Sequence, residues 1–325
     1  MNILIIRFTA LGDLVTLEPT FRAIRHFFKN ANITFVTTGV GKELYKDTNY
    51  FDDYILHTGV LKTIQKIPNK KFDLVINLQC NKPSHFINLS INKEKTINKS
   101  FNLFQKIFKI KTHSKSLDEM LIACGVEEEK AKEYFKKYSL IELSFKEDQG
   151  LKEELIAKFG NKKIIAISTG SSKRWESKKW GKENYKNLIL KLKDEFGIVL
   201  IGTQLEEEDS VYIKKECRDY PISYVNKTDL IKLKTILKTV DLYIGNDSGP
   251  SHIAAGVGTS TITIFCSTDI KHCVAFENYR GNHLYAKPDE NIKCYPCYKT
   301  VCPTHHECTQ NITVNDIYTL IKEIV

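Results

Sequence analysis

Glycine, small hydroxyl side chains and an acid lie together between residues 245 and 255, where a hydrophobic strand is expected to end and a helix to begin. The strand ends at Gly245-Asn246-Asp247, a tight turn follows at Ser248-Gly249-Pro250, and Ser251-His252 opens the helix. The first amide groups of a helix form its positive end, and Gly249 lets a ligand approach the backbone closely. The turn can therefore bind a diphosphate, or it is a well-capped strand–helix connection, since Asp and Ser are ordinary N-cap residues.

A second loop with the chemistry of an anion site follows an earlier hydrophobic strand. Its small donors are Thr169, Gly170 and Ser171, and its cations are Lys173, Arg174, Lys178 and Lys179. Such a loop can neutralise a pyrophosphate. It can equally be a solvated basic loop in which Trp180 packs over the following helix.

The first strand of the chain leads to an acid instead of a phosphate-binding turn. The hydrophobic run from Ile3 to Ile6 is followed by a turn with Gly12 and Asp13, whereas a dinucleotide-binding turn needs several glycines. On local chemistry alone, Asp13 is expected to cap the helix that follows.

Four of the nine cysteines lie close together near the C-terminus, at Cys294, Cys297, Cys302 and Cys308. This spacing suits a tetrahedral zinc site, and four thiolates also bind iron. Disulfides are the alternative, although a reducing cytoplasm favours the metal. Four protein ligands leave no open coordination position, so such a metal would be structural and not catalytic.

Hydrophobic strands and helical patterns alternate along the whole chain, and they place these residues at strand ends. Strands are predicted at 3–6, 33–37, 72–78, 163–168, 198–201, 241–244 and 261–265, with helices near 19–30, 117–124 and 127–160. The alternation predicts an α/β fold with two parallel sheets. We expect two Rossmann-like α/β/α domains facing a central cleft, residues 1–155 and residues 156–325.

Composition and charge limit the partners. The 325 residues are 42% hydrophobic and 27% charged, and no apolar run reaches the ~20 residues that span a bilayer. The first residues lack the pattern of a signal peptide, so we expect a cytoplasmic protein. The net charge of +9 favours anionic partners such as nucleotides, phosphorylated glycolipids, nucleic acid or a membrane surface.

Residues 93–115 form a basic stretch with aromatic residues at helical spacing, including Lys99, Lys106 and Lys109. Such a segment can lie on an anionic membrane or bind a phosphorylated glycolipid. It can also be a core-facing helix with solvated lysines.

Four ordered segments, at residues 5–25, 168–180, 226–258 and 294–308, carry a resemblance to a known family. They are similar to segments of the ADP-heptose:lipopolysaccharide heptosyltransferases, which are glycosyltransferases of GT-B fold. The turn at 11–13 and the turn at 245–249 are the more specific parts of the likeness. Together the segments span nearly the whole chain.

The resemblance implies a role for each motif. Asp13 would be the base that takes a proton from the acceptor sugar hydroxyl, and Lys178 would hold the donor diphosphate. Ser248 and Gly249 would add backbone donors, and Asp247 would position the donor sugar or the turn. Thr169, Gly170, Ser171 and His252 complete the expected donor site, and Lys99, Lys106 and Lys109 the expected acceptor site. Lys178 and the helix dipole can stabilise the leaving group without a catalytic metal.

One departure from the family concerns the donor nucleotide. Some members use an acidic residue to bind the ribose, and residues 222–230 contain no clear match. Serine at position 248, where many members have threonine, keeps the hydroxyl.

The sequence therefore predicts an inverting glycosyltransferase that moves a heptose or related sugar to the lipopolysaccharide inner core. The expected donor is a nucleotide-diphosphate sugar, ADP-heptose, and the expected place of reaction is the inner-membrane surface. A non-catalytic nucleotide-sugar or glycolipid-binding protein is the alternative, and the presence of Asp13 and Lys178 argues against it. Nucleic-acid binding through the cysteine cluster would explain the charge but not the turn at Gly249.

Overall fold

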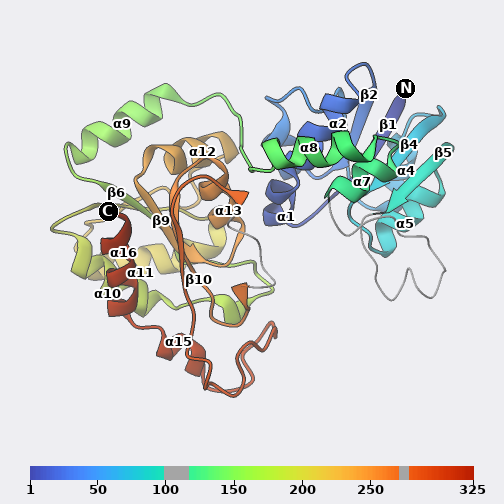
Figure 1. Ribbon diagram of the computed structural model, residues 1–325. Coiled ribbons are helices and arrows are strands. Elements are labelled where there is room, and N and C mark those ends of the chain that lie inside the picture. The colour runs from blue at the N-terminus through green and yellow to red at the C-terminus, as the bar shows by residue number, and fades with distance from the viewer. Residues whose placement is uncertain (99–116, 271–277) are drawn as a thin grey trace. The chain divides into compact units, whose positions relative to one another are not determined.

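The computed structural model describes residues 1–98, 117–270 and 278–325. The chain forms two compact units, Met1–Phe145 and Lys146–Val325, each with its own parallel sheet (Figure 1). Helix α9 (Gln149–Phe159) belongs to the second unit. The predicted boundary at 155/156 falls inside this helix.

The first unit is built on a five-stranded parallel sheet in the order β3-β2-β1-β4-β5. The strands are β1 (Asn2–Ile6), β2 (Asn32–Thr37), β3 (Asp53–Leu56), β4 (Phe72–Asn77) and β5 (Lys93–Asn98). The helices are α1 (Leu11–Thr16), α2 (Glu18–Phe27), α3 (Gly39–Tyr45), α4 (Val60–Lys66), α5 (Lys82–Leu89), α7 (Leu117–Ala123) and α8 (Glu128–Tyr138).

Both faces of this first sheet are covered by apolar side chains. On one face, Leu4, Ile6 and Val75 pack with Ile87 of α5 and with Ile64 of α4. Aromatic residues cover the other face, where Phe21 of α2 contacts Phe35 of β2 and Tyr45 of α3 with ring centroids 5.2 Å apart in each pair. A strand with apolar residues on both faces is expected in a parallel sheet covered by helices.

The second unit has a six-stranded parallel sheet in the order β11-β10-β9-β6-β7-β8. Its strands are β6 (Ile164–Ser168), β7 (Gly197–Leu200), β8 (Ile222–Ser223), β9 (Leu242–Asn246), β10 (Ser260–Ile264) and β11 (His283–Ala286). Besides α9, the helical elements are η1 (Glu176–Lys178), α10 (Lys182–Leu192), η2 (Gln204–Glu206), α11 (Glu207–Glu216), α12 (Leu230–Thr239), α13 (Gly249–Gly256), α15 (Glu307–Asn311) and α16 (Val314–Ile324).

In each sheet the first strand of the unit lies between the second and the fourth, so β1 is flanked by β2 and β4, and β6 by β7 and β9. The order of strands therefore reverses at β1 and at β6. In open α/β sheets, ligands bind beside the carboxyl ends of the strands at this reversal. In this chain the reversals place the loops after β1 and β4 side by side in the first unit, and the loops after β6 and β9 in the second.

The α/β class, the parallel sheets and the two-unit organisation agree with the sequence prediction. Residues 93–98, which were grouped with a helical pattern, form the edge strand β5, and residues 99–115 of that stretch lie outside the described residues. Within the described ranges, no helix combines the length and the hydrophobicity needed to cross a bilayer.

Candidate active site

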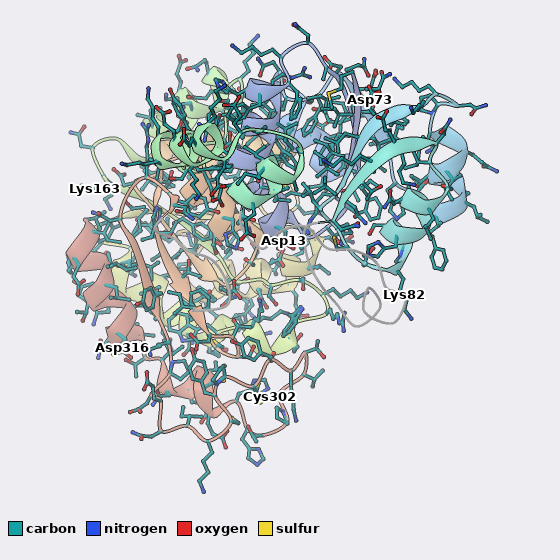
Figure 2. All side chains as sticks on the ribbon, turned by 45° about the vertical axis from the view of Figure 1, so that its right-hand side comes forward. Asp13, Asp73, Lys82, Lys163, Cys302 and Asp316 are labelled. Carbon is teal, nitrogen blue, oxygen red and sulfur yellow. The ribbon has the colours of Figure 1, made fainter. Side chains whose placement is uncertain are left out.

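Asp13 lies in the first turn of α1, directly after the loop that leaves β1 (Figure 2). The N-cap residue is Ala10, and its backbone N–H donates to Asp13 Oδ2 at 3.0 Å. The same oxygen lies 2.7 Å from the Arg7 guanidinium, while the Asp13 side chain is 57% exposed. Asp13 therefore helps to cap α1, as local chemistry predicts, and still presents an accessible carboxylate.

The loop that precedes α1 is held by residues that follow the neighbouring strand β4. Gln79 Oε1 accepts the backbone N–H groups of Phe8 at 2.8 Å and Thr9 at 3.1 Å. Arg7, whose side chain is 13% exposed, donates to the Leu78 carbonyl at 2.6 Å. One nitrogen of the Arg7 guanidinium is thus held by the Leu78 carbonyl, and the other contacts and orients the Asp13 carboxylate. The sequence analysis did not identify Arg7 or Gln79.

Two histidines lie near the same edge of the first sheet, where β3 and β4 end. The His57 ring stacks on Phe8 with centroids 3.8 Å apart, and its Nδ1 lies 2.9 Å from Thr63 Oγ1. His85 of α5 lies 3.3 Å from the Asn77 side-chain amide. Burial lowers the pKa of both histidines, which favours the neutral imidazole at neutral pH. The edge therefore carries two uncharged imidazoles, of which His85 is buried.

The structure brings Lys178 and Asp247 together in the second unit. Lys178 ends η1, after β6, and its Nζ lies 2.5 Å from Asp247 Oδ2, just after β9. The two side chains are 17% and 9% exposed. Thr268 Oγ1 also donates to Asp247 Oδ2, at 2.9 Å. An ammonium group has three N–H donors, so the contact with Asp247 uses one and the others can bind an anion.

Asn246 joins the two loops that carry this pair. Its Nδ2 donates to the carbonyls of Thr169 at 2.7 Å and Gly170 at 3.0 Å, and its Oδ1 accepts the backbone N–H of Trp180 and the Tyr185 hydroxyl, each at 3.0 Å. Trp180 is fully buried and meets Tyr185 of α10 edge-on. The prediction that Trp180 packs on the following helix is confirmed. Asn246 holds the two loops together through buried hydrogen bonds, and its residue type alone does not predict this role.

Helix α13 begins at Gly249, two residues before the predicted start at Ser251. Ser248 is its N-cap residue, but the Ser248 side chain makes no capping hydrogen bond. The positive end of this eight-residue helix therefore lies in the loop after β9, beside Asp247, without a capping side chain. The buried His252 of the same helix has its Nδ1 3.3 Å from the Tyr279 hydroxyl.

Ser171 is buried within its own loop. Its hydroxyl donates to the Trp175 carbonyl at 2.5 Å, and the Trp175 ring centroid lies 5.0 Å from Lys178 Nζ. Ser171 thus shapes the loop that carries the lysine.

Glu206 is a buried acid at the same edge of the second sheet, and the sequence analysis missed it. Its Oε2 accepts the Thr203 backbone N–H at 2.6 Å and the Thr203 hydroxyl at 2.8 Å. A Cβ at Gly170 would lie 1.9 Å from Glu206 Oε1, so a larger residue at position 170 would have to displace the carboxylate. In the sequence, Glu206 is marked by the capping pattern Thr-x-x-Glu that begins directly after Gly202.

The predicted acceptor lysines Lys99, Lys106 and Lys109 lie outside the described residues.

Residues 287–306, here called the cysteine tail, run without helix or strand from β11 to α15, and Cys302 marks them in Figure 2. Cys294 and Cys302 lie 3.9 and 3.6 Å from Thr304 Oγ1, whereas Cys308, in α15, is part of the hydrophobic core. The cysteines of the described ranges are free, and no group of three or more His, Cys, Asp or Glu side chains in those ranges is arranged to hold a metal. In this structure the four thiols are therefore not gathered into the predicted tetrahedral arrangement, and Cys308 packs in the core.

Cys302 of the cysteine tail and Cys308 of α15 differ in their ionisation. Partial burial acts against ionisation of Cys302, but the Thr304 and His306 backbone N–H groups and the Thr304 hydroxyl stabilise the thiolate and lower its pKa. Burial raises the pKa of Cys308. Cys302 is therefore more readily ionised than Cys308.

The family model described as glycosyltransferase family 9 (heptosyltransferase) matches residues 60–306. A curated relative, lipopolysaccharide heptosyltransferase 1 of Campylobacter coli, is 28% identical, and the alignment covers 100% of this chain and 99% of the relative. Lipooligosaccharide heptosyltransferase 2 of Campylobacter jejuni subsp. jejuni serotype O:2 is 26% identical, with 98% and 96% covered.

Solved structures with the same fold include a glycosyl transferase family 9 protein from Veillonella parvula DSM 2008, with a TM-score of 0.79, 16% identity and coverage of 99% and 96%. The E. coli ADP-heptose lps heptosyltransferase II has a TM-score of 0.77 at 14% identity, with 100% and 98% covered. The iron-containing dodecameric glycosyltransferase TibC of E. coli H10407 has a TM-score of 0.59 at 14% identity, with 99% of this chain and 75% of TibC covered. The fold is therefore GT-B, as predicted.

Proposed function

The chain belongs to glycosyltransferase family 9, the heptosyltransferases, and from this premise we propose that it transfers a heptose from ADP-heptose to the inner core of lipopolysaccharide, with inversion at the anomeric carbon. The observation that carries the proposal is the Lys178–Asp247 pair beside the N-terminus of α13. It provides a cation and a helix dipole at the edge where α/β sheets bind ligands. The relatives that act as heptosyltransferases support the choice of sugar and acceptor.

On the donor side, Lys178 binds the diphosphate with the N–H groups that Asp247 leaves available. The positive end of α13 adds to the stabilisation of negative charge as the nucleotide diphosphate leaves. This arrangement uses no catalytic metal. Asp247 orients the ammonium and lies next to the place where the sugar would be held.

On the acceptor side, Asp13 takes the proton of the attacking hydroxyl. The hydroxyl oxygen then forms a bond to the anomeric carbon from the face opposite the diphosphate, and the bond from that carbon to the diphosphate breaks. Arg7 holds the carboxylate in one direction, which is how a positioned base gains efficiency over a free one.

Glu206 is the best-placed acid for the ribose of the donor. Its buried carboxylate lies at the ends of β6 and β7, between Gly170 and Gly202, and carboxylates accept hydrogen bonds from hydroxyl groups. We propose this role for Glu206 in place of an acid at 222–230.

The acceptor in this proposal is anchored in a lipid, so we also propose that the protein works in the cytoplasm at the inner-membrane surface. The contacts predicted for Lys99, Lys106 and Lys109 stay predictions.

The decisive experiment incubates the purified protein with a panel of nucleotide sugars and truncated lipopolysaccharide acceptors and identifies products by mass spectrometry. The expected product is an acceptor whose mass has increased by one heptose, formed with ADP-heptose. Binding of ADP-heptose without any product, across the whole acceptor panel, would favour the non-catalytic alternative.

A structural metal held by Cys294, Cys297, Cys302 and Cys308 is a separate proposal, supported by the spacing of these four free thiols and not by their present arrangement. Elemental analysis of the purified protein is expected to find about one zinc or iron per chain, and Cys294→Ser should abolish retention of the metal because it removes one of the four ligands. Protein that contains no metal and has fully titratable tail thiols would show that these cysteines remain free thiols.

A further inference from the structure

The cysteine tail is bonded to the residue directly before Lys178. The Ser177 backbone N–H donates to the Thr300 carbonyl at 3.2 Å, and the Ser177 hydroxyl donates to the Lys299 carbonyl. The same hydroxyl lies 3.0 Å from Ser267 Oγ. Ser177 is 2% exposed, so these bonds form away from solvent. The backbone from which the lysine side chain extends is therefore held by the tail.

The tail also contacts the segment that holds the other member of the ion pair. Thr268, which donates to Asp247, has its carbonyl bonded to the Tyr295 hydroxyl at 3.1 Å. The carbonyl of the preceding residue, Ser267, accepts the Tyr298 backbone N–H at 3.0 Å. Each partner of the Lys178–Asp247 pair is thus supported by a residue that the tail binds.

We infer that Ser177 is a positioning residue for Lys178 and that the cysteine tail forms the structural support of the site for the donor's phosphates. A lysine side chain has many rotamers, so an ammonium can be held at a diphosphate only if its backbone is fixed and its head group is paired. Ser177 provides the first condition and Asp247 the second. This inference rests on the proposed function, because it assigns the support of the same donor site.

The test compares binding of ADP and of adenosine by calorimetry, in wild-type protein and in Ser177→Ala. The substitution removes the hydroxyl that binds Lys299 and so loosens the backbone that carries Lys178. The dissociation constant for ADP is expected to rise by up to about 10-fold, because the loss in binding is limited by the energy of that one buried hydrogen bond. The dissociation constant for adenosine, which has no phosphate, should not change. In kinetic assays, the KM for the sugar donor should rise more than kcat falls.

A matched control separates positioning from general loss of stability. Thr259→Val removes another buried hydroxyl bond, to the Leu237 carbonyl, at the opposite edge of the second sheet. It should lower the melting temperature without changing ADP binding. If Ser177→Ala does not fold, Tyr295→Phe provides a milder test from the Asp247 side, with an expected rise of about 3-fold in the ADP dissociation constant.

Three outcomes would overturn the inference. Unchanged ADP binding in both Ser177→Ala and Tyr295→Phe would show that the tail does not support the site. An equal loss of ADP and adenosine binding would show a general structural defect. Failure of the wild-type protein to bind ADP would instead contradict the proposed donor, and the inference with it.

Discussion

Replacement of Asp13 by asparagine is expected to lower sugar transfer about 10²–10⁴-fold, the usual contribution of a positioned general base. Asparagine keeps an oxygen that can accept the Ala10 N–H, so the first turn of α1 should remain capped. It removes the negative charge that faces Arg7 and the capacity to take a proton. The measurements are initial rates of transfer, the dissociation constant for ADP and the melting temperature.

Asp73 provides a matched control for this substitution. Its carboxylate also accepts a backbone N–H, from Asn2 at 2.6 Å, but it lies near the start of β4, away from the carboxyl edge of the sheet. Asp73→Asn should leave transfer unchanged. If Asp13→Asn transfers sugar at the parental rate, the base assignment is wrong and Asp13 acts only as part of the helix cap. If both variants lose activity and melting temperature together, the effect of Asp13 is structural.

The interior strands of both sheets could be predicted from the sequence, whereas the edge strands could not. Strands such as β1 and β6 are buried on both faces and appear as continuous runs of isoleucine, leucine and alanine. The edge strands β3, β5, β8 and β11 contain exposed or partly exposed positions and polar residues, so no such run marks them. Their pairing with a neighbouring strand, which is a long-range contact, defines them.

The same distinction holds for the site. Asp13, Lys178 and Asp247 each lie in a motif that follows a predicted strand, and their roles were assigned from the resemblance to the heptosyltransferases. Arg7 and Gln79 were missed because their roles depend on contacts between loops that are 70 or more residues apart in the sequence. Such contacts arise only when the order of the strands places β1 beside β4.

The second large effect is expected for Lys178→Met, which keeps an apolar side chain beside the Trp175 ring but removes the charge. Loss of a preorganised donor to a developing anion typically lowers kcat about 10²–10³-fold. The affinity for ADP should fall as well, because the Asp247 carboxylate, 9% exposed, would face the diphosphate without its partner. Lys163, which precedes β6 at the opposite edge and whose Nζ contacts the Val325 carbonyl, is the matched control. Lys163→Met should retain activity.

The double variant Lys178→Met/Asp247→Asn distinguishes two causes of the lower ADP affinity, which are the missing ammonium and the unpaired Asp247 carboxylate. Breaking one side of a largely buried ion pair leaves an uncompensated charge, and removing the second charge relieves this cost. The double variant is therefore expected to regain melting temperature and part of its ADP affinity, while kcat stays low because no cation remains to stabilise the leaving group.

A Lys178→Met variant with parental kcat and ADP affinity would contradict the phosphate role of Lys178 and make Lys173, Arg174 and Lys179 the candidates for it. A double variant that binds ADP no better than Lys178→Met would show that Asp247 does not repel the diphosphate, so the loss would come from the missing ammonium alone.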